Sequence, residues 1–401
     1  MADAVIVAAG RTPIGRAFKG SLVDCRPDDL AALAIKTVLA KLPQLDPQSV
    51  EDILLGCGQP AGESGFNIAR VVAVLAGLPD VPGVTVNRYC SSSLQTIRMA
   101  AHAIRAGEGD VFVAAGVETV SRYGAGASDI GKAVNPLFAD AMAMTAARSE
   151  KTGDPWVAPT GLPDIYIAMG QTAENVAEFE KVSRQEMDEF AALSQQRAVN
   201  SQDNGFFERE IIPVTLPDGT VVTRDDGPRA GTTVEKLSTL QPVFRQGGTV
   251  TAGNACPLND GAAAVVVMSD TRARELGIKP LARIVASGVS GLNPEIMGLG
   301  PVEACRQAMR RAGMTMDQID LVEINEAFAA QVIPSAKHLG ISWDKLNVKG
   351  GGIALGHPFG MTGARIMTTL LNALEDEDKQ FGLESMCVGG GQGMAMIIER
   401  L

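Results

Sequence analysis

The 401-residue chain contains few aromatic residues, few histidines and no excess of positive charge. Aromatic residues make up 4% of it, and there are only 3 histidines. The formal net charge of −11 at pH 7 would repel a phosphate backbone, and no basic block offsets that charge. The composition therefore argues against a nucleic-acid partner.

Long apolar segments are also missing. No uncharged apolar run reaches the roughly 18 to 20 residues that span a bilayer. The N-terminal MADAVIVAAGRTPIG shows no signal-peptide or transit-peptide pattern. We therefore expect a cytoplasmic protein that is not inserted in a membrane.

Cysteine pairs with metal-site spacing are absent as well. No two of the 6 cysteines have the Cys-x-x-Cys spacing of a zinc or redox motif. We expect free thiols, with no metal site and no disulfide framework. The cysteines are Cys25, Cys57, Cys90, Cys256, Cys305 and Cys387.

Short apolar runs alternate with alanine-rich helical stretches, which indicates an α/β protein with buried sheets flanked by helices. Four segments near the start are echoed near the end, which predicts two copies of one βα unit. EDILLG, VTVNRYCSSSLQ, DVFVAAG and AAAVVVMS correspond to IDLVEIN, LNVKGGGIALGH, ESMCVGGG and MAMIIE. Residues 122–247 differ, with loop-like stretches around a polar helical segment at 171–200, and we interpret them as a covering insertion.

Cys90 lies where an apolar extended run passes into a helical pattern, in VNRYCSSSLQTI. A thiol at a helix N-terminus is close to the positive end of the helix dipole and to unpaired N–H groups, which favour the reactive thiolate. The alternative is a small buried hydrophobe followed by serines that cap the helix.

Three further residues stand at turns. Cys387 precedes three glycines, whose N–H groups can face a developing oxyanion. His357, in a Gly-His-Pro turn, would be held in place as a base. Asn325, between a predicted strand and helix, can hold a water molecule. Each also has a structural alternative: a core cysteine, a histidine that caps backbone, and a helix N-cap.

Together these motifs resemble those of the thiolase family, the acetyl-CoA C-acyltransferases. The resemblance runs essentially from end to end, and the order and spacing of the motifs make it specific. The matching motifs are RTPIG, NRYCSSSLQ, MGQTAENVA, TVTAGNACPLNDGAAA, IMGLGPV, NEAFA, GHPFGMTGAR and CVGGGQG. The resemblance implies a thiolase fold, with two similar βαβαβαββ halves in a layered αβαβα sandwich and an inserted loop domain. The implied boundaries are 1–121 with 248–271, 122–247, and 272–401.

The resemblance also implies a role for each candidate. Cys90 would take the acyl group, His357 would activate it, and Cys387 would protonate the departing acetyl-CoA enolate or deprotonate acetyl-CoA in reverse. One oxyanion hole would consist of His357 and a water held by Asn325, and the other of the N–H groups of Cys90 and Gly389. Carbon–carbon cleavage needs this set: a nucleophile, a proton donor and stabilisation for two oxyanions.

Coenzyme A is implied as a substrate, and no cofactor is implied. The expected contacts with CoA or the acyl group are Arg229, Cys256, Met297 and Phe328. Arg229 matches a position that contacts the CoA nucleotide in relatives, where a cation suits a polyanion. Cys256 stands where many relatives have serine, and a thiol is a weaker hydrogen-bonding group.

The motif details favour a degradative 3-ketoacyl-CoA thiolase with a ping-pong reaction. Cys90 is followed by Ser-Ser, whereas Cys-Gly-Ser is usual in biosynthetic acetoacetyl-CoA thiolases, and Ala168 replaces their frequent histidine. Phe359, Met361 and Thr362 differ from the commonest Ile, Ala and Ser, which suggests a bulky acyl substrate, including a steroid side chain.

Three alternatives stay open. One is a biosynthetic acetoacetyl-CoA thiolase, and the second is a ketoacyl synthase of the same fold, which would have a histidine in place of Asn325. The third is an inactive relative that binds acyl-CoA, although such a protein would be expected to lack Cys90, His357 or Cys387. Relatives form dimers or dimers of dimers, so we expect a homodimer or homotetramer.

Overall fold

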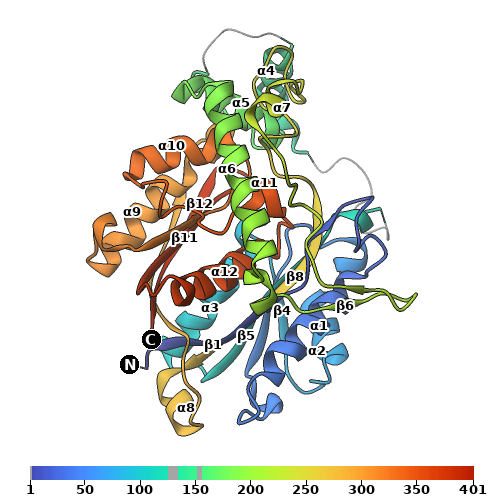
Figure 1. Ribbon diagram of the computed structural model, residues 1–401, viewed down its shortest axis with the longest axis vertical. Coiled ribbons are helices and arrows are strands. Elements are labelled where there is room, and N and C mark those ends of the chain that lie inside the picture. The colour runs from blue at the N-terminus through green and yellow to red at the C-terminus, as the bar shows by residue number, and fades with distance from the viewer. Residues whose placement is uncertain (1, 125–133, 151–155) are drawn as a thin grey trace.

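The computed structural model describes residues 2–124, 134–150 and 156–401. Strands and helices alternate through two successive halves (Figure 1). The first half contains β1 (Ala4–Arg11), α1 (Pro27–Ala40), β3 (Asp52–Gly56), α2 (Ile68–Leu75), β4 (Gly83–Val86), α3 (Ser92–Ala106), β5 (Val111–Thr119) and β8 (Asn259–Ser269). The second contains β9 (Ala282–Gly291), α9 (Gly300–Ala312), β10 (Leu321–Ile324), α10 (Ala329–Leu339), α12 (Thr362–Asp376), β11 (Phe381–Val388) and β12 (Gln392–Arg400).

The strands follow the order β10-β11-β12-β9-β1-β8-β5-β3-β4. Each half contributes one side of this order, and the halves are joined where β1 pairs with β9 through Val5–Arg283 and Ile6–Ala282. Each half combines parallel and antiparallel pairs: β3 pairs in parallel with β4 and β5 in the first half, and β10 pairs in parallel with β11 in the second. The predicted α/β class is confirmed.

The helices form layers around the strands. α3 and α12 contact each other and pack against strands of both halves, so they form the central layer. α1 and α2 cover the outer face of the first half, whereas α9 and α10 cover that of the second. Alternating side chains explain this arrangement, because buried residues of β1 and β8 face either the central cluster or the outer one.

The predicted duplication is visible in the order of elements. β1-α1-β3-α2 corresponds to β9-α9-β10-α10, and α3-β5-β8 corresponds to α12-β11-β12. One strand differs: at the place that corresponds to β4, the second half has only an isolated parallel bridge between Leu346 and Val322.

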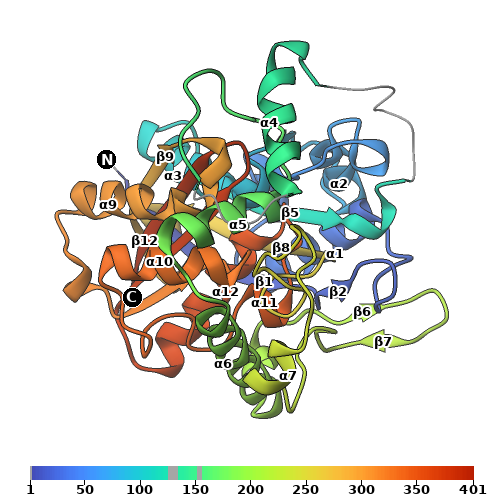
Figure 2. The ribbon, with the colours of Figure 1, turned by 90° about the horizontal axis from the view of Figure 1, so that it is seen from above.

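Between β5 and β8 the chain forms helices that lie over the ends of the layers, as Figure 2 shows from above. The helical segment predicted at 171–200 is two helices, because Lys181 adopts a left-handed conformation (φ +56°) and Ser183 starts a new helix with a capping box. The domain boundaries stay a prediction. The elements here are α4 (Ala139–Ser149), α5 (Met169–Glu180), α6 (Arg184–Asp203), β6 (Val214–Thr215), β7 (Val221–Val222) and α7 (Val234–Ser238).

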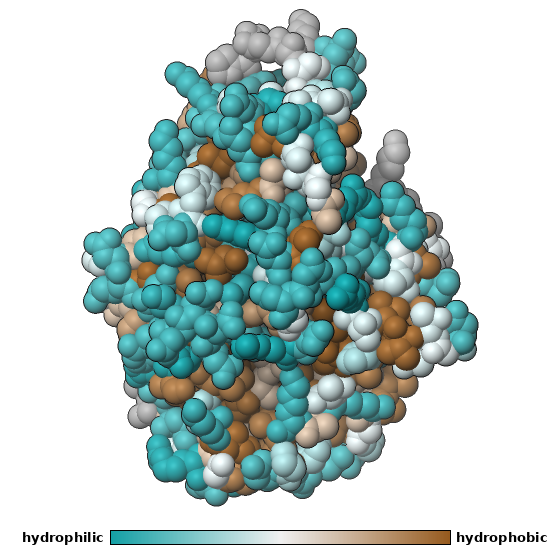
Figure 3. Space-filling model, viewed as in Figure 1, coloured by the Kyte–Doolittle hydropathy of each residue, from teal (hydrophilic) through white to brown (hydrophobic). Residues whose placement is uncertain are grey.

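The remaining short elements are β2 (Gly15–Arg16), α8 (Asp270–Glu275) and α11 (Gly352–Leu355). Hydrophilic residues dominate the face in Figure 3, where hydrophobic residues occur in separate patches. No helix in the described part of the chain has both the length and the apolar character needed to cross a bilayer.

Candidate active site

Cys90 is buried in a short 3₁₀ turn, Tyr89–Ser91, between β4 and α3. Tyr89 before it adopts a left-handed conformation with φ +43°, and its N–H donates to Asn87 Oδ1 at 2.8 Å. The serines do not cap α3 as the structural alternative supposed. Ser91 makes no capping bond, and Ser93 Oγ accepts instead from Ala364 N, at 2.9 Å.

The backbone N–H groups of Cys90 itself and of Gly389 act on the Cys90 thiol. They lower the pKa of the thiol, but burial acts more strongly and raises it to about 11. The thiolate expected from the helix dipole is therefore not the resting form. At neutral pH Cys90 is a neutral thiol with two donors in place for negative charge.

His357 is fixed at both ring nitrogens. Nδ1 lies 2.7 Å from Thr362 Oγ1, and the Thr362 hydroxyl donates its only proton to Pro358 O at 2.7 Å. His357 Nδ1 must therefore carry the proton that it shares with Thr362. Nε2 is left with a lone pair and lies 3.2 Å from Asn325 Nδ2, which donates to it.

The protonation of His357 follows from its surroundings. Burial and, secondarily, the nearby charge of Arg365 lower the imidazole pKa to about 3. His357 is thus neutral at physiological pH and able to accept a proton. Its turn allows no side chain at the preceding residue, because Gly356 has φ +114° and a Cβ atom there would come within 2.5 Å of Asn259.

Asn325 and Cys387 lie beside each other at the ends of neighbouring parallel strands. Ile324 of β10 is paired with Ser385 of β11, and Asn325 N donates to Ser385 O at 2.9 Å. Asn325 is not the helix N-cap of the structural alternative, since α10 begins later, after Phe328. Its Oδ1 is buried and has no hydrogen-bond partner in the described ranges of the chain, so it is an acceptor suited to a bound water.

Cys387 is fully buried. Burial and, to a lesser extent, the thiols of Cys90 and Cys256 raise its pKa well above the ordinary value. Cys387 is therefore protonated at neutral pH and can donate that proton. All six cysteines are free thiols.

The two halves meet at this site through the N-terminal ends of α3 and α12. A Cβ atom on Gly363 would lie 2.3 Å from Leu94 N, so the two helices approach closely. The turns before these helices carry Cys90 and His357. The strand ends of the second half carry Asn325, Cys387 and Gly389 to the same place. The candidate residues predicted from the sequence therefore come together from both halves.

Three of the four predicted CoA or acyl contacts belong to one apolar cluster. Phe328 and Met297 are buried in it, and Cys256 packs against it with its N–H donating to Ala327 O at 3.0 Å. Arg229 is not in this cluster but lies exposed, where it lines a hollow of about 580 Å³ beside α6. The contacts themselves stay predictions.

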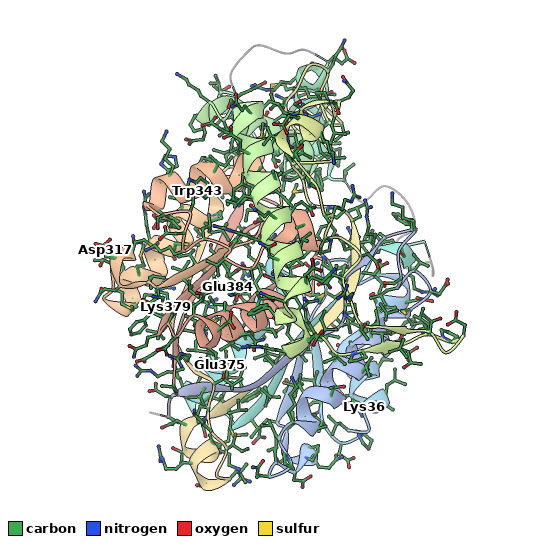
Figure 4. The ribbon with its side chains drawn as sticks, viewed as in Figure 1. Lys36, Asp317, Trp343, Glu375, Lys379 and Glu384 are labelled. Atoms are coloured by element: carbon green, nitrogen blue, oxygen red, sulfur yellow. The ribbon has the colours of Figure 1, made fainter. Side chains whose placement is uncertain are left out.

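Buried charges near the site were missed by the sequence analysis. Arg365 of α12, Glu323 of β10 and Glu384 of β11 are buried in the interior, where Figure 4 labels Glu384. Glu118, at the end of β5, is also fully buried. The available signal was an acidic residue inside an otherwise apolar strand pattern. Among the described residues, no group of three or more His, Cys, Asp or Glu forms a metal site.

Comparisons with known proteins agree with this architecture. Residues 4–271 match the family model for the thiolase N-terminal domain, and residues 278–400 match that for the thiolase C-terminal domain. The chain is 44% identical to a beta-ketoadipyl-CoA thiolase of Acinetobacter baylyi and 45% identical to a 3-ketoacyl-CoA thiolase of Aeromonas hydrophila, each with full coverage of both chains. It also resembles the crystal structure of the dimeric peroxisomal thiolase of Saccharomyces cerevisiae, with a TM-score of 0.89 and 37% identity over 100% of this chain and 97% of that one.

Proposed function

Because this chain belongs to the thiolase family and is an acyltransferase of the acetyl-CoA C-acyltransferase type, we propose that it is a 3-ketoacyl-CoA thiolase. CoA would cleave a 3-ketoacyl-CoA into acetyl-CoA and a shortened acyl-CoA through an acyl-Cys90 intermediate. The observation that carries this proposal is the meeting of the Cys90 turn and the His357 turn where α3 and α12 approach closely, with Asn325 Nδ2 3.2 Å from His357 Nε2.

In the first step Cys90 attacks the 3-keto carbon while its proton passes to His357. Because the resting pair is a neutral thiol and a neutral imidazole, proton transfer accompanies the attack rather than preceding it. The N–H groups of Cys90 and Gly389 then stabilise the tetrahedral oxyanion.

Carbon–carbon cleavage releases the enolate of acetyl-CoA. Cys387, which is protonated at neutral pH, supplies the proton to its carbon. The enolate oxygen is stabilised by His357 and by a water molecule that donates a hydrogen bond to Asn325 Oδ1. A second CoA thiol then takes the shortened acyl group from Cys90. The proton of that thiol passes to Cys387, His357 returns its proton to the Cys90 sulfur, and the cycle runs in reverse for condensation.

The acyl specificity is proposed at the level of 3-ketoacyl-CoA thioesters. Phe359, one basis for expecting a bulky substrate, has its ring edge-on to the His357 imidazole at a centroid distance of 5.2 Å. Thr362 keeps the hydroxyl that binds His357 Nδ1. These two departures from the commonest motif therefore have structural partners within the chain, and they do not require a steroid substrate.

The test is intact-mass spectrometry after the protein is mixed, without free CoA, with 3-ketoacyl-CoAs of graded length, acetoacetyl-CoA and beta-ketoadipyl-CoA. An acyl adduct on Cys90, shorter by two carbons, supports the proposal, and the preferred chain defines the substrate. Preference for acetoacetyl-CoA alone would favour the biosynthetic alternative. Binding of CoA without any adduct would favour the inactive one.

Cys90→Ala should abolish both the adduct and turnover, because no other group would form the thioester. Cys305→Ala is the matched control, since Cys305 is another buried thiol, on α9. It should retain activity. Substantial thiolysis by the Cys90→Ala variant would contradict the mechanism.

We further propose a homodimer as the minimal assembly. β4 is the edge strand of the sheet and its residues are partly exposed, which leaves an edge for pairing with a second chain. The similar yeast protein is described as dimeric. Light scattering after size exclusion distinguishes a dimer from a tetramer, and a monomer would refute the proposal. The cytoplasmic location stays a prediction.

A further inference from the structure

Glu118 is a single acceptor for donors from three separate segments of the chain. Its Oε2 accepts from Gly58 N and Gly360 N, each at 2.8 Å. Its Oε1 accepts from Gln59 N at 3.1 Å and from Tyr123 OH at 2.9 Å. The loop after β3, the turn before α12 and the segment after β5 are thus tied to one fully buried carboxylate.

Gly360 belongs to the turn that carries His357. This turn lies directly on the strand ends, because a Cβ atom on Gly360 would come within 2.3 Å of Val117 O, and one on Gly116 within 2.0 Å of Gly360 O. Without Glu118, the buried N–H of Gly360 would lose its acceptor, which is costly in a dry interior. The position of His357 therefore depends on this carboxylate.

Glu118 also affects the nucleophile through its charge. Burial raises the pKa of the Glu118 carboxyl, although the hydrogen bonds from Gly58 and Gly360 lower it. Glu118 in turn contributes to the raised pKa of the Cys90 thiol. A carboxylate at this place opposes formation of the Cys90 thiolate. Activation of the thiol therefore does not explain its presence, whereas the organisation of three loops does.

We propose that Glu118 is a positioning residue for thiolysis, which holds the His357 turn against residues 57–59 and so fixes the imidazole relative to Cys90. Glu118 acts by setting the position of His357 relative to Cys90, and it does not touch the reacting atoms. The inference rests on the proposed thiolase function and adds to it a residue of the first half that organises the catalytic base of the second.

Glu118→Gln tests the inference, because the amide keeps one acceptor oxygen but replaces the other with an NH₂ donor. We expect kcat to fall at least about 30-fold, while KM for the 3-ketoacyl-CoA changes less than about threefold. The pH profile for alkylation of Cys90 by iodoacetamide should shift to lower pH, because a neighbouring negative charge has been removed.

Glu384→Gln is the control for the loss of a buried carboxyl group without a change of charge, since Glu384 is fully buried on a strand of the second half and burial raises its pKa well above the ordinary value. It should leave kcat and the alkylation profile unchanged. A folded Glu118→Gln variant with unchanged kcat would overturn the proposal. A fall in kcat accompanied by an equally large rise in KM would also overturn it, because a general loss of packing would explain that result.

If Glu118→Gln does not fold, Glu118→Asp takes its place, since the shorter side chain does not reach Gly58 and Gly360 together. Wild-type acyl-enzyme formation is measured first. If the wild type forms no acyl-enzyme, the proposed function fails. If wild type and variant both form the adduct and have equal kcat, only the role of Glu118 is refuted. The alkylation measurement needs no acyl-CoA, so it is independent of the measurements of acyl-enzyme formation and of kcat.

Discussion

The two halves of the molecule place different residues at equivalent strand ends. Val113 of β5 pairs with Ile53 of β3, and Gly382 of β11 pairs with Leu321 of β10, which is the residue that corresponds to Ile53 when EDILLG is aligned with IDLVEIN. Glu118 lies five residues beyond Val113, and Cys387 lies five residues beyond Gly382. One position thus carries a carboxyl group that accepts hydrogen bonds from three loops, and the other carries the thiol that we propose as the proton donor.

The neighbouring strands show the same contrast. When EDILLG is aligned with IDLVEIN, Cys57 after β3 corresponds to Asn325 after β10. Cys57 is fully buried with its sulfur 3.8 Å from Glu118 Oε1, whereas Asn325 contacts the His357 imidazole. In the proposed mechanism the first half supplies the nucleophile and a rigid support, and the second supplies the proton-transfer groups. Duplication therefore gave one framework, on which only one set of strand ends carries the proton chemistry.

The largest expected effect comes from Cys387→Ala. We expect kcat for thiolysis to fall about 1,000-fold, because general acid catalysis commonly contributes 100-fold to 10,000-fold. Acylation of Cys90 by a simple acyl-CoA should persist, since that exchange releases a thiolate and needs no proton on carbon. Mass spectrometry for the acyl-enzyme and steady-state thiolysis separate the two steps. Loss of both activities in a folded variant would contradict the assigned role.

The second prediction compares Asn325→Ala with Cys57→Ala. Removing the amide takes away the donor to His357 Nε2 and the acceptor proposed to hold a water, so kcat should fall about 10-fold to 100-fold. Cys57→Ala should leave kcat within about twofold but lower the free energy of unfolding by about 1–2 kcal/mol, because it opens a small cavity. Kinetics and denaturant unfolding measure both. Equal effects of the two substitutions on kcat would contradict the different roles assigned to these corresponding strand ends.

The sequence was sufficient for the fold class and for the convergence of Cys90, His357, Asn325 and Cys387, because turn glycines and strand ends mark them locally. It did not predict Glu118, whose donors come from residues far apart in the chain. The resting protonation of Cys90 was also missed, because burial, a property of the packed molecule, outweighs the helix dipole that the local pattern indicated.

The buried acids Glu323 and Glu384 escaped prediction for the same reason. They are register neighbours on β10 and β11, and both face α12, where the nitrogens of the Arg365 guanidinium have no hydrogen-bond partner among the described residues. Sequence patterns indicated only apolar strands at these positions. Glu323 and Glu384 become neighbours of each other and of Arg365 only when the strands pair and α12 packs on them.

The third prediction concerns these acids and the pH dependence of stability. Burial raises the pKa of Glu323 to about 8 and that of Glu384 well above its ordinary value. The folded state therefore keeps protons that the unfolded state releases. Stability is greatest below the unfolded carboxyl pKa of about 4.5 and is lost as pH rises toward 8, by up to about 1.4 kcal/mol per pH unit and group.

Glu384→Gln should remove part of this loss, because an amide releases no proton. We expect the variant to be about 1–3 kcal/mol more stable than wild type at pH 8 and close to wild type at pH 5. Denaturant unfolding at both pH values provides the measurement. Equal pH dependence in the two proteins would show that Glu384 is ionised in the folded state.

The smallest effect is expected where the two halves meet beside the substrate. The N–H of Cys256 donates to Ala327 O of the second half, and its side chain packs against the cluster that contains Phe328. Cys256→Ser replaces a weak hydrogen-bonding group with a stronger one of similar size. If this side chain contacts CoA, KM for CoA should fall up to about threefold with kcat unchanged. Ala255→Ser, one residue earlier on the same segment, is the control. A rise in KM for CoA would instead mean that the site favours the thiol, because the hydroxyl is then buried without a partner.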